Sequence, residues 1–150
     1  MLHADTYVSV KRFPLAFSPK LPDGWRVGKP HRNAIAFDFV CSRWMDDLVI
    51  AAPGADRLRI FVQGCDVLLF GEMTKKSGSF TYRIDRGDWA TGSAHCADGN
   101  MRMVELMAEG LDPDREHKLD IFPDLQPDQE LRIECICVAG DPALVSIREE

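Results

Sequence analysis

The sequence lacks several features that would assign it quickly to a class of protein. No apolar run approaches the ~20 residues that span a bilayer, and residues 1–6 show no basic stretch followed by an apolar one. The 24 Asp and Glu outnumber the 18 Lys and Arg, and the net charge is −6. Nucleic acids and anionic membranes require a basic face, so we expect neither as a partner. The missing signal peptide favours a cytoplasmic location, although a truncated secreted domain would look the same.

Disulfide and zinc signatures are also missing. The five cysteines are an odd number and include no Cys-x2-Cys knuckle: Cys41, Cys65, Cys96, Cys135 and Cys137. A chain of 150 residues buries about two-thirds of its unfolded surface and needs no disulfide for stability. We therefore expect free thiols and no metal ligands, with Cys135 and Cys137 as small buried side chains.

No catalytic signature is complete. Ser93, His95 and Asp98 are residue types of a hydrolytic triad, but no Gly-x-Ser-x-Gly elbow presents the serine. We assign no catalytic residue. Arg86-Gly87-Asp88 matches an integrin-recognition tripeptide, yet three-residue matches arise by chance and Gly-Asp is ordinary turn chemistry. Adhesion is therefore not the function that we infer.

Turn residues are what the sequence has in abundance. They recur at short intervals, and Gly, Pro and Asp each favour turns for a known reason: 22–24, 53–56, 64–66, 77–78, 86–88, 112–114, 126–128 and 140–142. Hydrophobic residues make up 45% of the chain and charged residues 28%, which is typical of a globular domain. No repeat or linker divides the chain, so we predict one domain over residues 1–150.

Between the turns, apolar and polar residues alternate with a period of two. This pattern is typical of half-buried antiparallel strands, and it occurs in five runs: 35–39, 58–62, 80–84, 117–121 and 131–137. The last run places Leu131, Ile133, Cys135 and Cys137 on one apolar face. Val67–Phe70 is apolar on both sides and predicts an interior strand. The fold class is therefore all-β, an antiparallel sandwich or barrel.

Residues 101–109 are ambiguous. Met101, Val104, Met107 and Leu111 recur at helical spacing, and Met, Glu, Leu and Ala are good helix formers. The period alone leaves one short helix and a strand equally open.

Several strand-and-turn pieces carry a family resemblance. They are Leu58–Gly64, Val67–Gly71, Gly78–Asp85, Leu111-x5-His117-x-Leu119-x-Ile121 and Leu131–Gly140. Their order, strongest over residues 48–140, resembles jelly-roll, galactose-binding-like β-sandwiches. Such domains occur as carbohydrate-binding modules and as the N-terminal domain of SGNH/GDSL-type esterases. The chain departs from the pattern where Arg86 separates Asp85 from Gly87 and where Arg115-Glu116 replaces a glycine. The resemblance implies a jelly roll in which residues 101–109 form a strand.

The segment from Asp85 to Asn100 is the main candidate site. We predict it to be a long loop, and the resembling modules often carry a tryptophan here and bind ligands at this end. Sugar recognition requires an aromatic face and fixed polar groups. Trp89 would then stack on a sugar ring while Asp88, His95 and Asn100 bond its hydroxyls. The alternative is a long connection whose tryptophan covers the end of the sandwich.

Other candidates have both a binding and a structural interpretation. Trp44 and Trp25 would extend a sugar platform or cover an open edge of the sandwich. Asp46-Asp47 is a calcium candidate, but Ca²⁺ needs six or more oxygens from several loops and a solvated turn is the simpler interpretation. His117 begins a core-facing alternation, which favours a hydrogen-bonded structural histidine over a ligand.

The function inferred from the sequence is a non-catalytic accessory domain that binds carbohydrate or packs on a neighbouring catalytic domain. The alternative is the N-terminal part of an SGNH-type carbohydrate esterase. Its catalytic residues would lie outside this chain, because the Gly-Asp-Ser block of those enzymes is missing here. A third possibility is an interaction or assembly module that uses a sheet face or an open strand edge.

Overall fold

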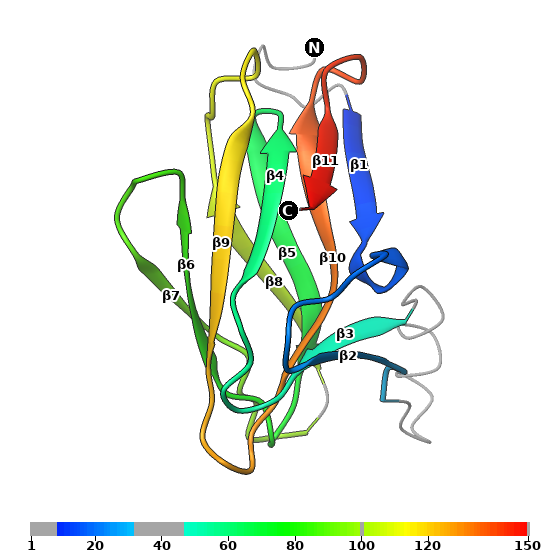
Figure 1. Cartoon of the computed structure of the whole chain (residues 1–150), viewed down its shortest axis with the longest axis vertical. Coiled ribbons are helices and arrows are strands. Elements are labelled where there is room, and N and C mark those ends of the chain that lie inside the picture. Colours follow the sequence, from blue (N-terminus) through cyan, green and yellow to red (C-terminus); the bar gives the residue numbers. More distant parts are fainter. Residues whose placement is uncertain (1–8, 32–46, 100, 150) are drawn as a thin grey trace.

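The computed structural model describes residues 9–31, 47–99 and 101–149, and over these ranges two antiparallel sheets pack as a sandwich (Figure 1). Sheet A has the order β2 (Trp25–Gly28), β3 (Leu48–Ala51), β10 (Leu131–Gly140), β5 (Asp66–Met73) and β8 (Met101–Ala108), and β1 (Ser9–Pro14) also pairs with β10. Sheet B has the order β11 (Ser146–Glu149), β4 (Leu58–Gln63), β9 (His117–Asp124), β6 (Ser79–Ile84) and β7 (Ala90–Ser93).

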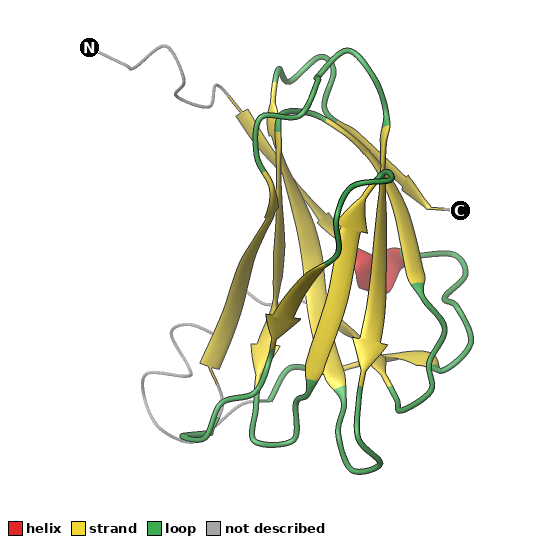
Figure 2. Ribbon diagram, turned by 90° about the vertical axis from the view of Figure 1, so that its left-hand side faces the viewer, coloured by secondary structure: helices red, strands yellow, loops and turns green. Residues whose placement is uncertain are grey.

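The predicted all-β sandwich is confirmed. Figure 2 shows the strands from the side, with one short 3-10 turn, η1 (Leu15–Phe17), among the described residues. No helix within the described ranges is both long enough and apolar enough to cross a membrane. Four of the five alternating runs and the interior strand at 67–70 are observed as strands, while the run at 35–39 lies outside the described residues.

Residues 101–108 form strand β8, as the family resemblance predicts. β8 pairs with β5 from Met101 opposite Met73 to Ala108 opposite Val67. Met103 and Met107 are buried in the core, while Val104 and Leu106 are exposed. The helical spacing of apolar residues is therefore misleading, because the edge strand has apolar side chains on both of its faces.

The core lies between the two sheets. Its largest fully buried apolar side chains come from both layers: Leu69, Leu131, Ile133 and Ile136 from sheet A, and Ile60, Phe80, Leu119 and Ile121 from sheet B. Each such side chain contributes about 1.5–3 kcal/mol by leaving water. The period-two pattern of the sequence thus sets which face of each strand points inward.

The predicted core-facing side of the strand at residues 131–137 is wrong beyond Ile133. The pairing of β10 with β5 shifts in register between Ile133 and Cys135, and a bulge of this kind inverts the alternation beyond it. Ile136 and Val138 therefore enter the core cluster. Cys135 and Cys137 are buried free thiols on the opposite face, with their sulfur atoms 4.0 Å apart.

The predicted long loop from 85 to 100 is also wrong, because its middle forms strand β7. Ala90–Ser93 pairs with β6 along its whole length. The run Ala-Thr-Gly-Ser has no apolar period and no bulky residues, so it gives no strand signal of its own. Gly92 allows β7 to pack closely against Phe80 of β6, because a Cβ at position 92 would lie 2.3 Å from the Phe80 ring.

Asp85 holds the turn that follows β6. It is a non-glycine residue with φ of 53°, a conformation that Asp and Asn tolerate better than most residues. Its carboxylate accepts hydrogen bonds from the Lys118 backbone N–H (2.8 Å) and is bonded to His117 Nδ1 (2.9 Å). His117 Nε2 is bonded to the Asp112 carbonyl at 2.9 Å. The structural interpretation of His117, which is buried, is therefore confirmed.

The pKa of Asp85 lies below its ordinary value of 3.8. Partial burial raises it, but the hydrogen bonds from the Lys118 backbone and from His117 lower it more. A carboxyl with a lowered pKa stabilises the fold above its ordinary pKa, and this stabilisation is lost as the pH falls through the lowered value.

Asp85→Asn tests this turn. The substitution keeps the size and the tolerance for positive φ but removes the charge. We expect a loss of about 1–2 kcal/mol of unfolding free energy at pH 7, measured by urea denaturation. The difference from the wild type should shrink below the ordinary pKa of 3.8. Asp114→Asn, at an exposed loop position, is the control, and an equal effect in both variants would contradict the role of Asp85.

Candidate functional site

Trp89 lies on the outer face of sheet B, just before β7. Tyr82 of β6 pairs with Ala90 of β7. Trp89, one residue before Ala90, therefore lies next to Arg83, one residue after Tyr82. The Arg83 guanidinium lies over the indole, 4.4 Å from the ring centroid. Phe122 of β9 contacts Trp89 edge-on, with centroids 5.2 Å apart. Trp89 nevertheless remains 49% exposed, so about half of its surface is open to solvent.

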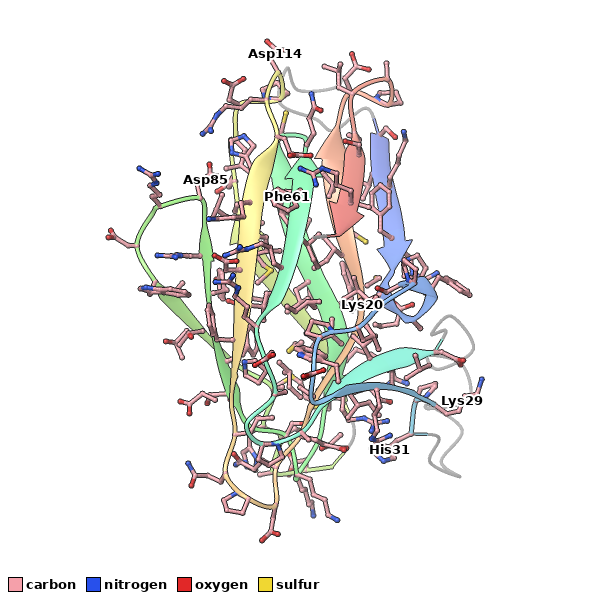
Figure 3. The ribbon with its side chains drawn as sticks, in the orientation of Figure 1. Lys20, Lys29, His31, Phe61, Asp85 and Asp114 are labelled. Carbon is pink, nitrogen blue, oxygen red and sulfur yellow. The ribbon has the colours of Figure 1, made fainter. Side chains whose placement is uncertain are left out.

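A hollow adjoins Phe122 on the same side of the molecule. It has a volume of about 600 Å³ and is lined by residues 20–22, residues 56–59 and Phe122. Figure 3 labels Lys20 in the segment that runs beside β4. Trp25 fastens this segment, because its indole N–H donates to the Asp56 carbonyl at 2.7 Å. Trp25 is buried, which agrees with its structural interpretation rather than with a sugar-binding platform.

Asp120 of β9 organises the cations around this site. Its fully buried carboxylate accepts from Arg59 Nε at 2.6 Å, and Arg83 Nε and Lys118 Nζ lie 3.6 and 4.0 Å from it. Burial raises the pKa of Asp120, but the hydrogen bond and charge of Arg59 outweigh it, so the pKa is lowered. Asp120 thus holds Arg83 below Trp89 and Arg59 at the rim of the hollow.

A third aromatic ring lies on the same face. Phe61 of β4 pairs with Lys118 of β9, and Figure 3 shows it in front of the ribbon of sheet B. The Arg148 guanidinium lies 4.0 Å from its ring centroid and is bonded to Glu116 at 2.6 Å. We call the surface formed by Trp89, Phe122 and Phe61 the aromatic face.

The aromatic face combines flat apolar rings with fixed charged groups. Sugar rings have an apolar side that stacks on aromatic rings and hydroxyls that need hydrogen-bond partners, so this combination suits carbohydrate. Among the described residues, the buried Arg83 Nε has no hydrogen-bond partner within bonding distance. Nothing in the arrangement of Arg59, Arg83 and Asp120 provides a nucleophile with a base beside it.

The structure brings together only part of the predicted site. Asp88 is exposed in the same turn as Trp89. His95 lies beyond the other end of β7, where it bridges to Thr74, about 20 Å away at ~3.3 Å per residue. The Ser93 hydroxyl accepts from the backbone N–H of His95 at 3.3 Å. Asn100 and Trp44 lie outside the described residues.

Sequence reasoning missed Phe122, Arg83, Arg59 and Asp120. The strongest available signal was Phe122, because an aromatic directly after Ile121 puts an apolar side chain at a polar-face position of the strand. Phe61 likewise is an aromatic residue at a polar-face position, between the core-facing Ile60 and Val62. The contribution of Asp120 could not be found this way, since a single acidic residue on a polar face resembles a solvated one.

The calcium candidate gains no support from its neighbours. Asp47 forms an ion pair with Lys29 at 2.5 Å, and Asp46 lies outside the described residues. In the part of the chain that the structure describes, no three His, Cys, Asp or Glu side chains are grouped to hold a metal ion.

The fold and the aromatic face define a β-sandwich domain with an exposed aromatic surface and hollow on one sheet. No protein-family model matches the chain, and no curated protein matches it. Solved structures match its fold. One is described as a two-domain esterase (CEX) active on acetylated mannans, co-crystallised with mannopentaose, with a TM-score of 0.67 at 11% identity. Another is a family two carbohydrate esterase from Cellvibrio japonicus, with a TM-score of 0.56 at 13% identity.

These matches cover 93% and 88% of this chain but only 38% and 34% of the esterases. The chain thus spans little more than a third of their length. The resemblance to esterase-associated β-sandwiches that the sequence suggested is confirmed at the level of the fold.

Asp120→Asn tests the charge network under the aromatic face. It removes the buried charge that pairs with Arg59, and removing one partner of a buried ion pair costs roughly 3 kcal/mol. Because the pKa of Asp120 is lowered, its stabilisation is present above the ordinary carboxyl pKa and lost as the pH falls through the lowered value. Urea denaturation should therefore show a large deficit at pH 7 that narrows in acid. Asp124→Asn, exposed on the same strand, is the control, and a deficit that does not change with pH would contradict this role.

Proposed function

We propose that this chain is a non-catalytic accessory domain that binds carbohydrate through its aromatic face. The observation that carries the proposal is Trp89, which is half-exposed and backed by Arg83. A tryptophan held only to cover the end of the sandwich would bury its ring. Here the ring is half-exposed, and its neighbour Phe122 lines a hollow of about 600 Å³, a size in the range of small-ligand sites.

The solved structures support the substrate class. One of the esterases with this fold is described as active on acetylated mannans and was crystallised with mannopentaose. We therefore propose a neutral oligosaccharide as the ligand, with its ring stacked on Trp89 and its chain extending past Phe122 toward the hollow. Asp88 and Arg59 would bond hydroxyls on either side of the stacked ring.

Trp89→Ala tests the proposal by isothermal titration with mannopentaose, followed by an array of neutral oligosaccharides. Loss of one stacking aromatic removes on the order of 1–3 kcal/mol, the cost of truncating an interface residue that matters, so the affinity should fall at least about fivefold. Phe17→Ala is the matched control, because Phe17 is 76% exposed and lies in η1, away from the aromatic face.

Phe122→Ala separates the aromatic face from Trp89 alone. Phe122 lines the hollow and touches Trp89, so its loss should weaken binding of longer oligosaccharides more than that of shorter ones.

Equal binding by the wild type and Trp89→Ala would eliminate the proposed site. No binding of any oligosaccharide by the wild type would favour a packing role.

The second candidate function is packing against a neighbouring domain through the outer face of sheet A. Val104 and Leu106 of β8 are exposed. They pair with Phe70 and Leu68 of β5, which face the same side. Together these side chains form an apolar patch, and such patches commonly mark interfaces.

Hydrogen exchange of β8 tests this second candidate. We expect slower amide exchange at Met101–Ala108 in the protein encoded by the complete reading frame than in residues 1–150 alone, because a packed domain would shield the strand. Exchange in β4, inside sheet B, serves as the internal reference. A reading frame with no further domain, or equal exchange of β8 in both proteins, would contradict packing.

A further inference from the structure

A second cleft lies away from the aromatic face. It is at the end of the sandwich where β5 turns into β6 and where β10 begins. A cavity of about 490 Å³ there is lined by Arg26, His31, Lys75, Lys76, Arg132 and Glu130, together with Thr74 and Gly99. A smaller hollow of about 250 Å³ shares Arg26, Lys76 and Glu130 with it. The two hollows therefore form one continuous cleft.

The lining of this cleft is positively charged although the protein is acidic. Among the described residues, Arg26, Lys75, Lys76 and Arg132 contribute four cations against the two carboxylates of Glu130 and Asp128, on a chain whose net charge is −6. A local excess of one sign in a cleft concentrates ligands of the opposite sign.

Glu130, one of the two carboxylates that line the cleft in the described part of the chain, is already neutralised. Arg132 Nη1 bonds Glu130 at 2.9 Å, and Arg26 Nη2 lies 3.6 Å from its second oxygen. Arg132 is itself saturated by Glu72 at 2.7 Å and by the Lys29 carbonyl at 2.6 Å. Within the described residues the Lys75 and Lys76 side chains form no ion pair, so both ammonium groups remain for a ligand.

The backbone that carries the two lysines is held in place. The Thr74 and Ser77 hydroxyls are bonded at 2.9 Å, and the Lys76 N–H donates to the Thr74 hydroxyl at 3.2 Å. The Lys76 carbonyl accepts from the Glu130 N–H at 2.9 Å, and the Gly78 N–H donates to the Glu130 carbonyl at 3.3 Å. Thr74 and Ser77 are buried, so binding requires only the lysine side chains to become ordered.

We propose that this cleft binds a phosphate monoester. The adjacent ammonium groups of Lys75 and Lys76, which form no ion pair among the described residues, favour a group that carries close to two negative charges at pH 7 over a singly charged carboxylate. Lys75 and Lys76 would contact the phosphate oxygens as point charges, and Arg26 would close the site from β2. The cavity is far larger than a phosphate ion, which leaves room for an attached sugar. This site is independent of the aromatic face.

The proposal is tested by isothermal titration with inorganic phosphate, glucose 6-phosphate and glucose, on the wild type and on the double variant Lys75→Gln/Lys76→Gln. Glucose 6-phosphate should bind more tightly than glucose, because only the phosphate ester contacts the two lysines. The double variant should lose about tenfold in affinity, because two charge-assisted contacts are removed at exposed positions. Binding of inorganic phosphate with equal affinity would identify the anion itself as the ligand and would still support the site.

Lys20→Gln is the matched control, since Lys20 is an exposed cation that lines the other hollow. It should bind glucose 6-phosphate as the wild type does. Amide chemical shifts of Thr74, Lys76 and Gly78 should move on titration, which locates the site independently of affinity. The proposal is overturned if neither phosphate compound binds at millimolar concentration, or if the double variant binds as tightly as the wild type.

Discussion

Hydrogen bonding along both edges of β10 is the constraint on which sheet A depends. β5 pairs along one edge, while β3 and β1 share the other, β3 beside Leu131–Ile133 and β1 beside residues 135–140. β2 and β8 join the sheet only through β3 and β5. A buried strand must satisfy its backbone groups on both sides, so β10 directly fixes the positions of three other strands, β1, β3 and β5. The bulge after Ile133 then decides which side chains reach the core.

Buried carboxylates on the outer faces play a comparable part for the two proposed sites. Asp120 holds Arg59 and Arg83 beneath the aromatic face, and Glu72 holds Arg132 at the base of the basic cleft. In each case a buried carboxylate orients guanidinium groups. The side chains next to these guanidinium groups, Trp89 in one site and Lys75 and Lys76 in the other, are exposed to solvent. This arrangement keeps the cations in place before any ligand arrives, which lowers the ordering cost of binding.

Particular residues show how far sequence reasoning reached. The alternation at 58–62 and 117–121 predicted strands β4 and β9 correctly, because one buried face imposes the period. The alternation at 131–137 failed after Ile133, since a bulge adds one residue without changing the composition of the strand. Trp89 was proposed as a binding residue from its residue type and its predicted loop, and in the structure its side chain is half-exposed. Its partners Phe122 and Arg83 come from other strands, and local sequence does not reveal such neighbours.

The sequence by itself determined the all-β class, the positions of the main strands and the acidic, globular character of the chain. These properties follow from composition and from local periodicity. The tertiary structure alone decided that β7 exists, that His95 lies far from Trp89, and that Lys75-Lys76 meets Arg26 and Arg132 in one cleft. Each of these depends on which strands become neighbours, and that choice is set by burial and backbone pairing between segments far apart in the chain.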